Sequence, residues 1–431
     1  MLIVLAVCLP SGQARAEEEA LDLQTVLDQA KPGETIDLQP GTYEGPITIN
    51  KPLTLRPERE GEVILRNGSL QPAISISADQ TTVAGLHIID EAVKEAPTVL
   101  VTGDRVVLEG LQIRTGADGI VVRDADEGVV TRTTIDWAAE GVRMADKGNG
   151  IDLFNAHRWR MLDNTIRDVH DGIYMESSDN ASVSGNVIER SRYGVHCMYT
   201  KGTMIERNVG MLNVTGAMVM TARQVSVTGN TFAKQSENVN SQGILLYDAH
   251  ETIVADNTVD GNRVGLYVEQ STGNRLENNR ISYNFIGIQL LESHENTITA
   301  NQFFGNVADA QARGSESNAL SGNYWDSFRG IDADGDGKSD ISYAINPFFQ
   351  GMTQKRPAFQ LFFQSPGMVF LEGLYQTERD RWSTDSAPLM APPDGGLQIG
   401  AMDGGSETGV AGFVLLGCSS LLFYRMRRRG T

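Results

Sequence analysis

The chain has 431 residues, of which 55 are acidic and 36 basic, so its net charge is −19 at pH 7. Such an acidic chain excludes nucleic-acid binding through a broad basic face. Hydrophobic residues make up 40% and charged residues 21%, which is globular composition and excludes wholesale disorder and a polytopic membrane protein. With 45 glycines against 14 prolines, the composition favours a turn-rich β protein.

The N-terminal segment, residues 1–16, has the pattern of a secretory signal peptide. A short apolar run is followed by a Pro-Ser-Gly break and a small-x-small cleavage site at residues 14–16. We therefore expect the body of the protein to be exported. Residues 17–60 are expected to form an N-terminal cap and a first coil, because residues 21–30 are an amphipathic helical stretch followed by Pro-Gly turns.

Residues 61–326 contain an internal repeat of 22 residues. Asparagines recur at this spacing in two runs separated by one 27-residue step, and glycine plus an apolar residue follows most of them by eight residues. The asparagines are Asn164, Asn186, Asn208 and Asn230, then Asn257, Asn279, Asn301 and Asn323; the glycines are Gly119, Gly141, Gly172, Gly194, Gly216, Gly243, Gly265 and Gly287, with a 9-residue insertion expected between Gly141 and Gly172. This period predicts an all-β parallel β-helix in which each coil stacks on the last and the asparagines form a buried ladder.

Alternation along the strands predicts two columns of outward side chains. The first column reads Val121, Arg143, Tyr174, His196, Met218, Leu245, Tyr267 and Gln289, and the second Arg123, Ala145, Glu176, Met198, Met220, Tyr247, Glu269 and Leu291. Met144, Met175 and Cys197 are expected to point into the core.

Methionine normally fills cores, so the outward methionines beside His196 are unusual. Imidazole and thioether are ligands that suit Cu(I), and adjacent coils bring them within reach of one ion. The copper candidates are therefore His196, Met198, Met218 and Met220, with His170 nearby. The alternative is an apolar docking surface for a partner, with no metal involved.

Residues 327–387 contain an acidic loop and are expected to close the far end of the stack, with the Phe- and Pro-rich stretch 347–370 as the cover. The loop matches a calcium-binding pattern, with carboxylates at Asp332, Asp334, Asp336 and Asp340 and a backbone carbonyl at Lys338. Position 12 is Tyr343 instead of a bidentate glutamate. The predicted calcium site is therefore a structural clip and not a switch.

The C-terminal region reads as a linker over residues 388–409 and a hydrophobic segment over 410–431. Val410–Tyr424 is apolar and is followed by four arginines, Arg425, Arg427, Arg428 and Arg429. By the positive-inside rule these would stay in the cytoplasm and leave the body outside the inner membrane. The segment is expected to be a membrane anchor or a sorting tail that is removed.

Several motifs together resemble the periplasmic maturation protein family of nitrous oxide reductase, NosD, over about residues 20–360. They are the Pro-Gly turns near residues 32 and 40, the 22-residue repeat, and Asn323-Tyr-Trp-Asp326 followed by the acidic loop. The resemblance implies a right-handed β-helix in the periplasm that is not an enzyme. It also implies work with an ABC transporter (an ATPase and a permease) and a copper chaperone lipoprotein in maturing the copper sites of nitrous oxide reductase.

Two other classes compete with this interpretation. Asp168-Val-His170-Asp171 loosely resembles the Asp-Pro-His-Asp motif of alginate epimerases, so the chain could be a carbohydrate-active or carbohydrate-binding β-helix such as an alginate C5-epimerase-like protein, with polyuronate epimerase or lyase activity. A purely structural surface repeat protein is the third class. Valine replaces the proline of the epimerase motif, which weakens the carbohydrate interpretation.

Overall fold

The computed structural model describes residues 22–59, 61–235, 241–362 and 365–393. The predicted signal peptide, the 410–431 segment and most of the predicted linker lie outside these residues. None of the helices in the described part of the chain is long and apolar enough to cross a membrane.

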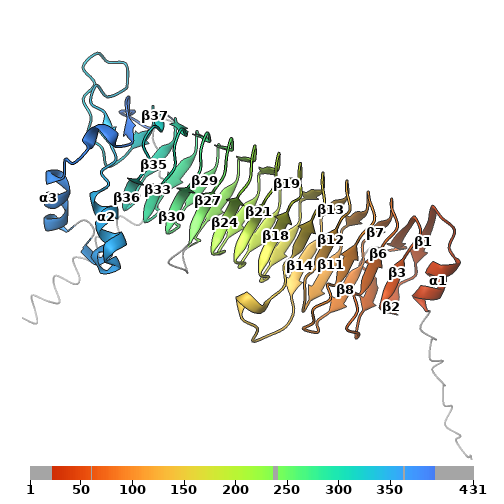
Figure 1. Cartoon of the computed structure of the whole chain (residues 1–431). Helices are drawn as coiled ribbons and strands as arrows, with labels where there is room; N and C mark the ends of the chain where they lie inside the picture. Colours follow the sequence, from red (N-terminus) through yellow and green to blue (C-terminus); the bar gives the residue numbers. More distant parts are fainter. Residues whose placement is uncertain (1–21, 60, 236–240, 363–364, 394–431) are drawn as a thin grey trace, which may run out of the picture.

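The described chain winds into coils of three strands, and every third strand pairs in parallel, which builds three long sheets (Figure 1). The exception is β39, which pairs antiparallel with β40 at the end of sheet A. Sheet A contains β1 (Glu34–Leu38), β4 (Leu53–Pro57), β7 (Thr82–Ala84), β10 (Val107–Glu109), β13 (Val129–Thr131), β16 (Arg160–Leu162), β19 (Ser182–Ser184), β22 (Met204–Glu206), β25 (Ser226–Thr228), β28 (Ile253–Ala255), β31 (Arg275–Glu277), β34 (Thr297–Thr299), β37 (Ala319–Ser321), β40 (Thr384–Asp385) and β39 (Tyr343–Ala344). Sheet B contains β2 (Gly41–Glu44), β5 (Val63–Arg66), β8 (His87–Asp90), β11 (Gln112–Thr115), β14 (Thr134–Trp137), β17 (Thr165–Arg167), β20 (Val187–Glu189), β23 (Val209–Met211), β26 (Thr231–Ala233), β29 (Thr258–Asp260), β32 (Arg280–Ser282), β35 (Gln302–Phe304) and β38 (Tyr324–Trp325). Sheet C contains β3 (Ile47–Ile49), β6 (Ile74–Ile76), β9 (Val99–Val101), β12 (Ile120–Arg123), β15 (Ile151–Phe154), β18 (Asp171–Glu176), β21 (Tyr193–Met198), β24 (Thr215–Met220), β27 (Gln242–Tyr247), β30 (Val264–Glu269), β33 (Ile286–Leu291) and β36 (Ala308–Arg313).

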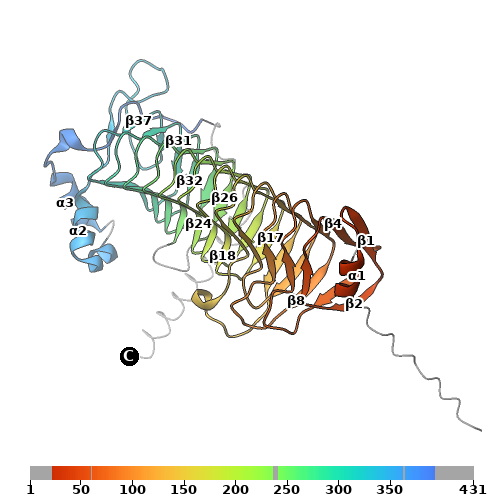
Figure 2. The same ribbon diagram turned by 45° about the vertical axis from the view of Figure 1, so that its right-hand side comes forward.

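This is a right-handed parallel β-helix, so the predicted fold class is confirmed. Short helices lie at its two ends and in one insertion: α1 (Leu23–Gln29), η1 (Met144–Asp146), α2 (Phe348–Lys355), η2 (Pro357–Phe362), α3 (Pro366–Leu374) and η3 (Arg379–Arg381). Helix α1 covers the first coil with Leu23 and Leu27, both almost fully buried. Figure 2 shows α1 at one end of the stack and α2 and α3 at the other.

The predicted asparagine ladder runs through the bend between sheets A and B. The side-chain oxygen of Asn186 accepts hydrogen bonds from the backbone N–H of Asn164 at 3.0 Å and from its Nδ2 at 2.9 Å, and the same pair of bonds recurs from coil to coil. The Nδ2 of Asn186 also donates to the Met161 carbonyl at 2.9 Å. Each rung therefore satisfies buried polar groups that the bend would otherwise leave unpaired.

The repeated glycine has a packing role on sheet C. A Cβ added to Gly194 would lie 2.5 Å from the carbonyl oxygen of Gly216 in the next coil, closer than any real contact. Glycine therefore recurs here because backbone stacks directly on backbone.

The insertion lies elsewhere than the sequence predicted. Coils on sheet C begin at Gly119, Gly150 and Gly172, so the extra residues form a loop over residues 138–149 that carries η1. Gly141 has the spacing of the repeated glycines and an apolar neighbour, but it lies in this loop and not on sheet C. The predicted 9-residue insertion between Gly141 and Gly172 was therefore wrong in position, although a long insertion is present.

The far end closes through aromatic stacking. Trp325 stacks on Phe303 with ring centroids 4.2 Å apart, and Tyr343 covers Trp325 at 4.7 Å. Asp385 of β40 then takes the place of the next ladder asparagine, because its carboxylate accepts from the N–H and the Nδ2 of Asn323. Within the predicted cover, residues 347–370, Phe349 and Met368 are buried apolar side chains. That this whole stretch covers the end stays a prediction.

Candidate functional site

Parallel pairing on sheet C aligns two columns of outward side chains, from the coil of β15 to that of β36. The first column is Asp152, Tyr174, His196, Met218, Leu245, Tyr267, Gln289 and Gln311, and the second is Phe154, Glu176, Met198, Met220, Tyr247, Glu269, Leu291 and Arg313. Met175 and Cys197, between the columns, are fully buried in the core as predicted, and burial raises the pKa of the Cys197 thiol to about 12.

The start of each predicted column needs correction. Arg143 and Ala145 lie in the 138–149 loop, and their places in the columns belong to Asp152 and Phe154. Met144, predicted to be core, is half-buried in the same loop.

His196 lies on the outer face, but it is only 6% exposed. The rings of Tyr174 and Tyr193 pack against the imidazole, with centroids 5.0 and 4.9 Å away. His196 therefore points outward from the barrel, as the alternation predicts, and the two tyrosines cover it.

The two ring nitrogens of His196 have different environments. Nδ1 lies 3.0 Å from Oδ2 of Asp171. Nε2 is buried and has no hydrogen-bond partner among the described residues. A buried polar atom without a partner costs free energy, so such an atom in a folded protein calls for a specific explanation.

Asp171 is held in its charged form. Burial by itself would raise the pKa of this carboxyl group, but hydrogen bonds from Arg192 and His196 bring the pKa below its ordinary value. The guanidinium of Arg192 donates to both carboxylate oxygens, at 2.8 and 2.6 Å. A charged carboxylate at Nδ1 favours the tautomer with the proton on Nδ1, which leaves a lone pair on Nε2 of His196.

Sulfur atoms lie beside this imidazole. Met218 is the direct partner of His196 in the next coil, where parallel strands are about 4.8 Å apart. Met198 pairs in the same way with Met220 in the second column, and all three methionines are half-buried on the outer face. The structure therefore brings together the four predicted residues His196, Met198, Met218 and Met220 on two adjacent coils.

A hollow of about 560 Å³ lies along the same face. Its lining is Met144, Ala145, His170, Arg192, Tyr193, Val214, Thr215, Gln242 and Leu245. The 138–149 loop supplies one wall, as expected of an insertion beside the groove. His170 lines this hollow, and its burial, and next the charge of Arg192, lower the pKa of its imidazole.

Sequence reasoning missed Asp171, Arg192 and Tyr193 as parts of the site. Asp171, Tyr193 and Thr215 pair in register and form a third outward column at the start of the strands. This column could have been found by counting one residue back from each repeated glycine. Instead, Asp171 was considered only within the epimerase-like motif.

The acidic loop gathers part of the predicted calcium set. Oxygens of Asp332, Asp334 and Asp336 lie within 4.8 Å of one another. Asp340 is not in this group; its Oδ2 accepts from the N–H of Ala333 at 2.8 Å. Lys338 donates its backbone N–H to Asp336. Calcium binding by this loop stays a prediction.

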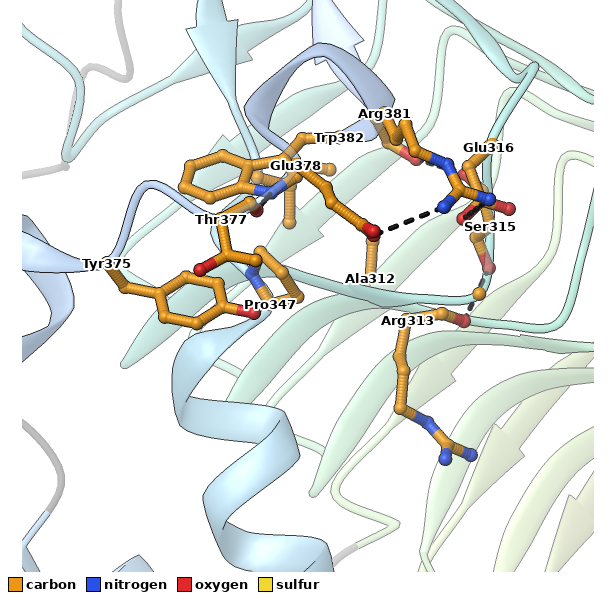
Figure 3. A pocket seen from close by; sticks show the side chains of 13 residues that line it. Ala312, Arg313, Ser315, Glu316, Pro347, Tyr375, Thr377, Glu378, Arg381 and Trp382 are labelled. Atoms are coloured by element: carbon orange, nitrogen blue, oxygen red, sulfur yellow. Dashed lines mark hydrogen bonds and ion pairs between the residues drawn. The ribbon is translucent and has the colours of Figure 1, made fainter.

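A second small cavity of about 130 Å³ lies where the C-terminal segment meets the last coil (Figure 3). Arg381 lies 3.2 Å from Glu378 and 3.7 Å from Glu316, and Tyr375 stacks on Trp382 with centroids 6.0 Å apart. Arg381 therefore joins the segment around Glu378 to Glu316 of the last coil, whereas Arg313 is paired with Glu292 outside the cavity.

Fold comparison places the chain among right-handed parallel β-helices. Its structure is similar to an alginate lyase solved in complex with G6 (TM-score 0.53, 12% identity, covering 71% of this chain and 83% of that one). It is also similar to a Family 28 exopolygalacturonase of Yersinia enterocolitica (TM-score 0.51, 13% identity, covering 68% and 74%). At such identities the similarity shows the fold alone.

Sequence comparison gives the family. Residues 138–330 match the family described as periplasmic copper-binding protein (NosD). A "Probable ABC transporter binding protein NosD" of Stutzerimonas stutzeri is 31% identical over 412 residues, covering 89% of this chain and 92% of the relative. A protein of the same description from Pseudomonas aeruginosa is 29% identical over 383 residues, covering 83% and 88%. The chain belongs to the NosD family, as its motifs predicted.

Proposed function

We propose that this protein is a non-catalytic periplasmic scaffold that holds Cu(I) on the outer face of sheet C during copper-site maturation of nitrous oxide reductase. The observation that carries the proposal is the buried Nε2 of His196, which lacks a partner in the described structure and has Met218 beside it on the next coil. Copper is the cargo of this site and not a resident cofactor.

The donor set fits Cu(I). A neutral imidazole nitrogen and thioether sulfurs are soft or borderline ligands, and Cu(I) accepts the low coordination numbers that one histidine and one or two methionines provide. Asp171 acts as the outer carboxylate that orients a metal-binding histidine. The packed rings of Tyr174 and Tyr193 limit water near Nε2, which favours soft ligands over water and oxygen donors.

The partners follow from the family. Both relatives carry names that connect them with an ABC transporter, and the family description is periplasmic. We infer that the scaffold works with the permease and ATPase of such a transporter, receives copper from a chaperone lipoprotein and serves nitrous oxide reductase. The apolar run at Val410–Tyr424 with its following arginines would hold it at the inner membrane.

Competition for Cu(I) against a chromogenic chelator tests the site in the full chain. Replacing His196 with Asn together with Met218 with Leu should lower the affinity by about ten-fold or more, because both proposed ligands are lost. Matched controls are His294→Asn and Met204→Leu, since His294 bonds the Glu316 carbonyl and Met204 lies exposed on sheet A. Equal copper affinity of the double variant and the wild type would overturn the assignment.

The docking alternative, in which the methionines bind a partner without metal, gives a different result. In that case none of the variants would change chelator competition, but Met198→Asp with Met220→Asp would abolish capture of a purified transporter or reductase. Loss of partner capture with intact copper affinity would therefore replace the copper proposal with an apolar docking surface.

The carbohydrate alternative has less support, because the carboxylates of its motif are already paired with arginines. Asp168 forms two hydrogen bonds of 2.8 Å with Arg190, and Asp171 is paired with Arg192. Burial and the neighbouring Glu176 raise the pKa of Tyr174, so its phenol is not prepared to act as a base. Product formation on a uronate polymer would establish this alternative and displace the scaffold proposal.

A further inference from the structure

Helix α3 presents an apolar surface to solvent at the C-terminal end of the stack. Val369, Phe370, Leu371 and Leu374 are 54, 66, 47 and 62% exposed, and Phe362 of η2 is 53% exposed. We name these five residues the C-terminal apolar face. Other large exposed apolar residues in the described chain, such as Leu70 and Val93, are scattered along the stack, so this concentration is unusual.

The helix is firmly attached, so the exposure does not reflect an unpacked segment. Ser365 caps its N-terminus, and Met368 is buried beneath it. The side-chain amide of Asn346 donates to the Glu372 carbonyl at 2.8 Å. Phe348 of α2 packs on Tyr375, just after α3. The rigid cap therefore holds the apolar side chains outward in a fixed orientation.

Cations flank this face although the chain as a whole is acidic. Lys355 and Arg356 are exposed at the end of α2, and Arg379 is exposed in η3. Arg381 is not counted with them, because it is paired with Glu378 and Glu316. Glu372 is half-buried on α3, where burial raises the pKa of its carboxyl group. Apolar and aromatic side chains with a lysine and arginine rim are the composition of segments that lie in a membrane interface.

The position in the chain points to the same partner. The described chain continues from the cap to residue 393, with Leu389 bridged to Tyr324 of the last coil. The sequence that follows contains the apolar run Val410–Tyr424 and four arginines. The described chain therefore ends beside the last coil, at the end of the stack where Figures 1 and 2 show α3, and the predicted membrane segment follows it in the sequence.

We propose that the C-terminal apolar face rests in the surface of an anionic lipid bilayer, so that the β-helix contacts the membrane through its last coil. Phe370 and Leu374 enter the acyl boundary, and the flanking cations meet lipid phosphates. The proposal does not depend on copper binding. It goes beyond the attachment by residues 410–431, because it adds a contact made by the folded body.

Fluorescence quenching by brominated lipids tests the contact in the full chain. The full-length Phe370→Trp variant is added to vesicles of phosphatidylcholine and phosphatidylglycerol that contain the brominated lipids. The emission of the native tryptophans, measured with the unsubstituted protein, is subtracted. The matched control is Leu70→Trp, because Leu70 is also highly exposed, at 72%, but lies near the other end of the stack. Both variants keep the same C-terminal residues, so membrane attachment by that segment is common to the two.

We expect quenching at position 370 to be about three-fold or more stronger than at position 70, with a blue shift of its emission. Adding Leu374→Asp to Phe370→Trp should reduce that quenching towards the level of the control. Equal quenching at positions 370 and 70 overturns the proposal. The proposal is also overturned if the blue shift occurs only with vesicles that contain a transporter permease and without quenching by lipid. The C-terminal apolar face would then bind protein.

Discussion

The bend between sheets A and B and the outer face of sheet C use polar side chains in opposite ways. In the bend, Asn208 accepts from Asn186 through Oδ1 and donates through Nδ2 to the next asparagine and to the Val183 carbonyl. On sheet C, His196 is equally buried, yet its Nε2 has no partner within the described residues. The ladder is complete and repeats over many coils, whereas the histidine occurs once and is incomplete.

Repetition and complete hydrogen bonding distinguish structural polar groups from functional ones in a repeat protein. A polar side chain that recurs in every coil with all its hydrogen bonds made is accounted for by stability, because each coil needs it to fold. An unsatisfied side chain that does not repeat has no such explanation, and at His196 it lies among half-buried methionines of the same coils. Variants that break the ladder should therefore cost much stability, and variants of the histidine should cost little.

The largest effect is expected at the last rung. Asp385→Ala leaves the N–H of Asn323, one of its two Nδ2 hydrogens and the indole N–H of Trp325 buried without an acceptor; the other Nδ2 hydrogen still binds the Ile298 carbonyl. We expect a loss of about 4 kcal/mol in the free energy of unfolding, measured by urea titration. Asp385→Asn keeps an acceptor oxygen and should lose much less; equal losses would show that the carboxylate charge is what matters.

A mid-stack rung should cost slightly less. Asn208→Ala removes an acceptor for two donors of Asn186 and leaves the Val183 carbonyl without its side-chain donor. The expected destabilisation is about 3 kcal/mol by the same titration. A second row of amides runs through the bend between sheets B and C, where Asn306 accepts from the N–H and Nδ2 of Asn284. Asn306→Ala, at a half-buried position of this row, should cost about 1 kcal/mol, because water can replace the amide there. A reversed order would contradict the burial argument.

Replacing Asp309 is expected to increase the free energy of unfolding at neutral pH. Burial raises the pKa of its carboxyl group to about 6, so the folded protein binds this proton more tightly than the unfolded chain. The stability from this group is present below about pH 4 and is lost as the pH rises to about 6. Asp309→Asn should add about 2 kcal/mol at neutral pH and remove this slope. Asp256→Asn, at an exposed position, is the control, and an unchanged slope in Asp309→Asn would refute the prediction.

The smallest effect is expected at His196. His196→Leu removes an unpaired buried nitrogen and keeps an apolar side chain between the tyrosine rings, but it deprives Asp171 of one donor. We expect the free energy of unfolding to change by less than about 1 kcal/mol, while copper affinity falls. A loss as large as that of Asn208→Ala would show that His196 is a structural residue.

Much of the fold could be predicted because the repeat is encoded by residues with a single physical role. The ladder asparagines and the stacked glycines fixed the period, the three-sheet coil and the phase of Tyr174, His196 and Met218. The prediction failed before Gly172, because Gly141-Val142 in the 138–149 loop imitates the repeated glycine and its apolar neighbour. Only strand pairing shows that Gly150 begins that coil.

The outward residues of the candidate site could be predicted from the sequence, but their surroundings could not. Alternation along one strand shows which side chains leave the barrel, so Met198, Met218 and Met220 were placed correctly on the outer face. Whether such a side chain meets water depends on neighbours in other coils. The cover of Tyr174 and Tyr193 over His196 follows from ring packing between coils, which the spacing of residues does not reveal.

The last rung of the ladder, Asn323 with Asp385, is formed by residues far apart in the chain. Asn323 and Asp385 are 62 residues apart in the chain, so the stack stays open until the chain has emerged as far as Asp385. Any product that stops earlier would display an unpaired strand edge ready to add another strand. Such fragments should associate end to end, because the carboxylate that occupies this edge in the full chain is missing from them.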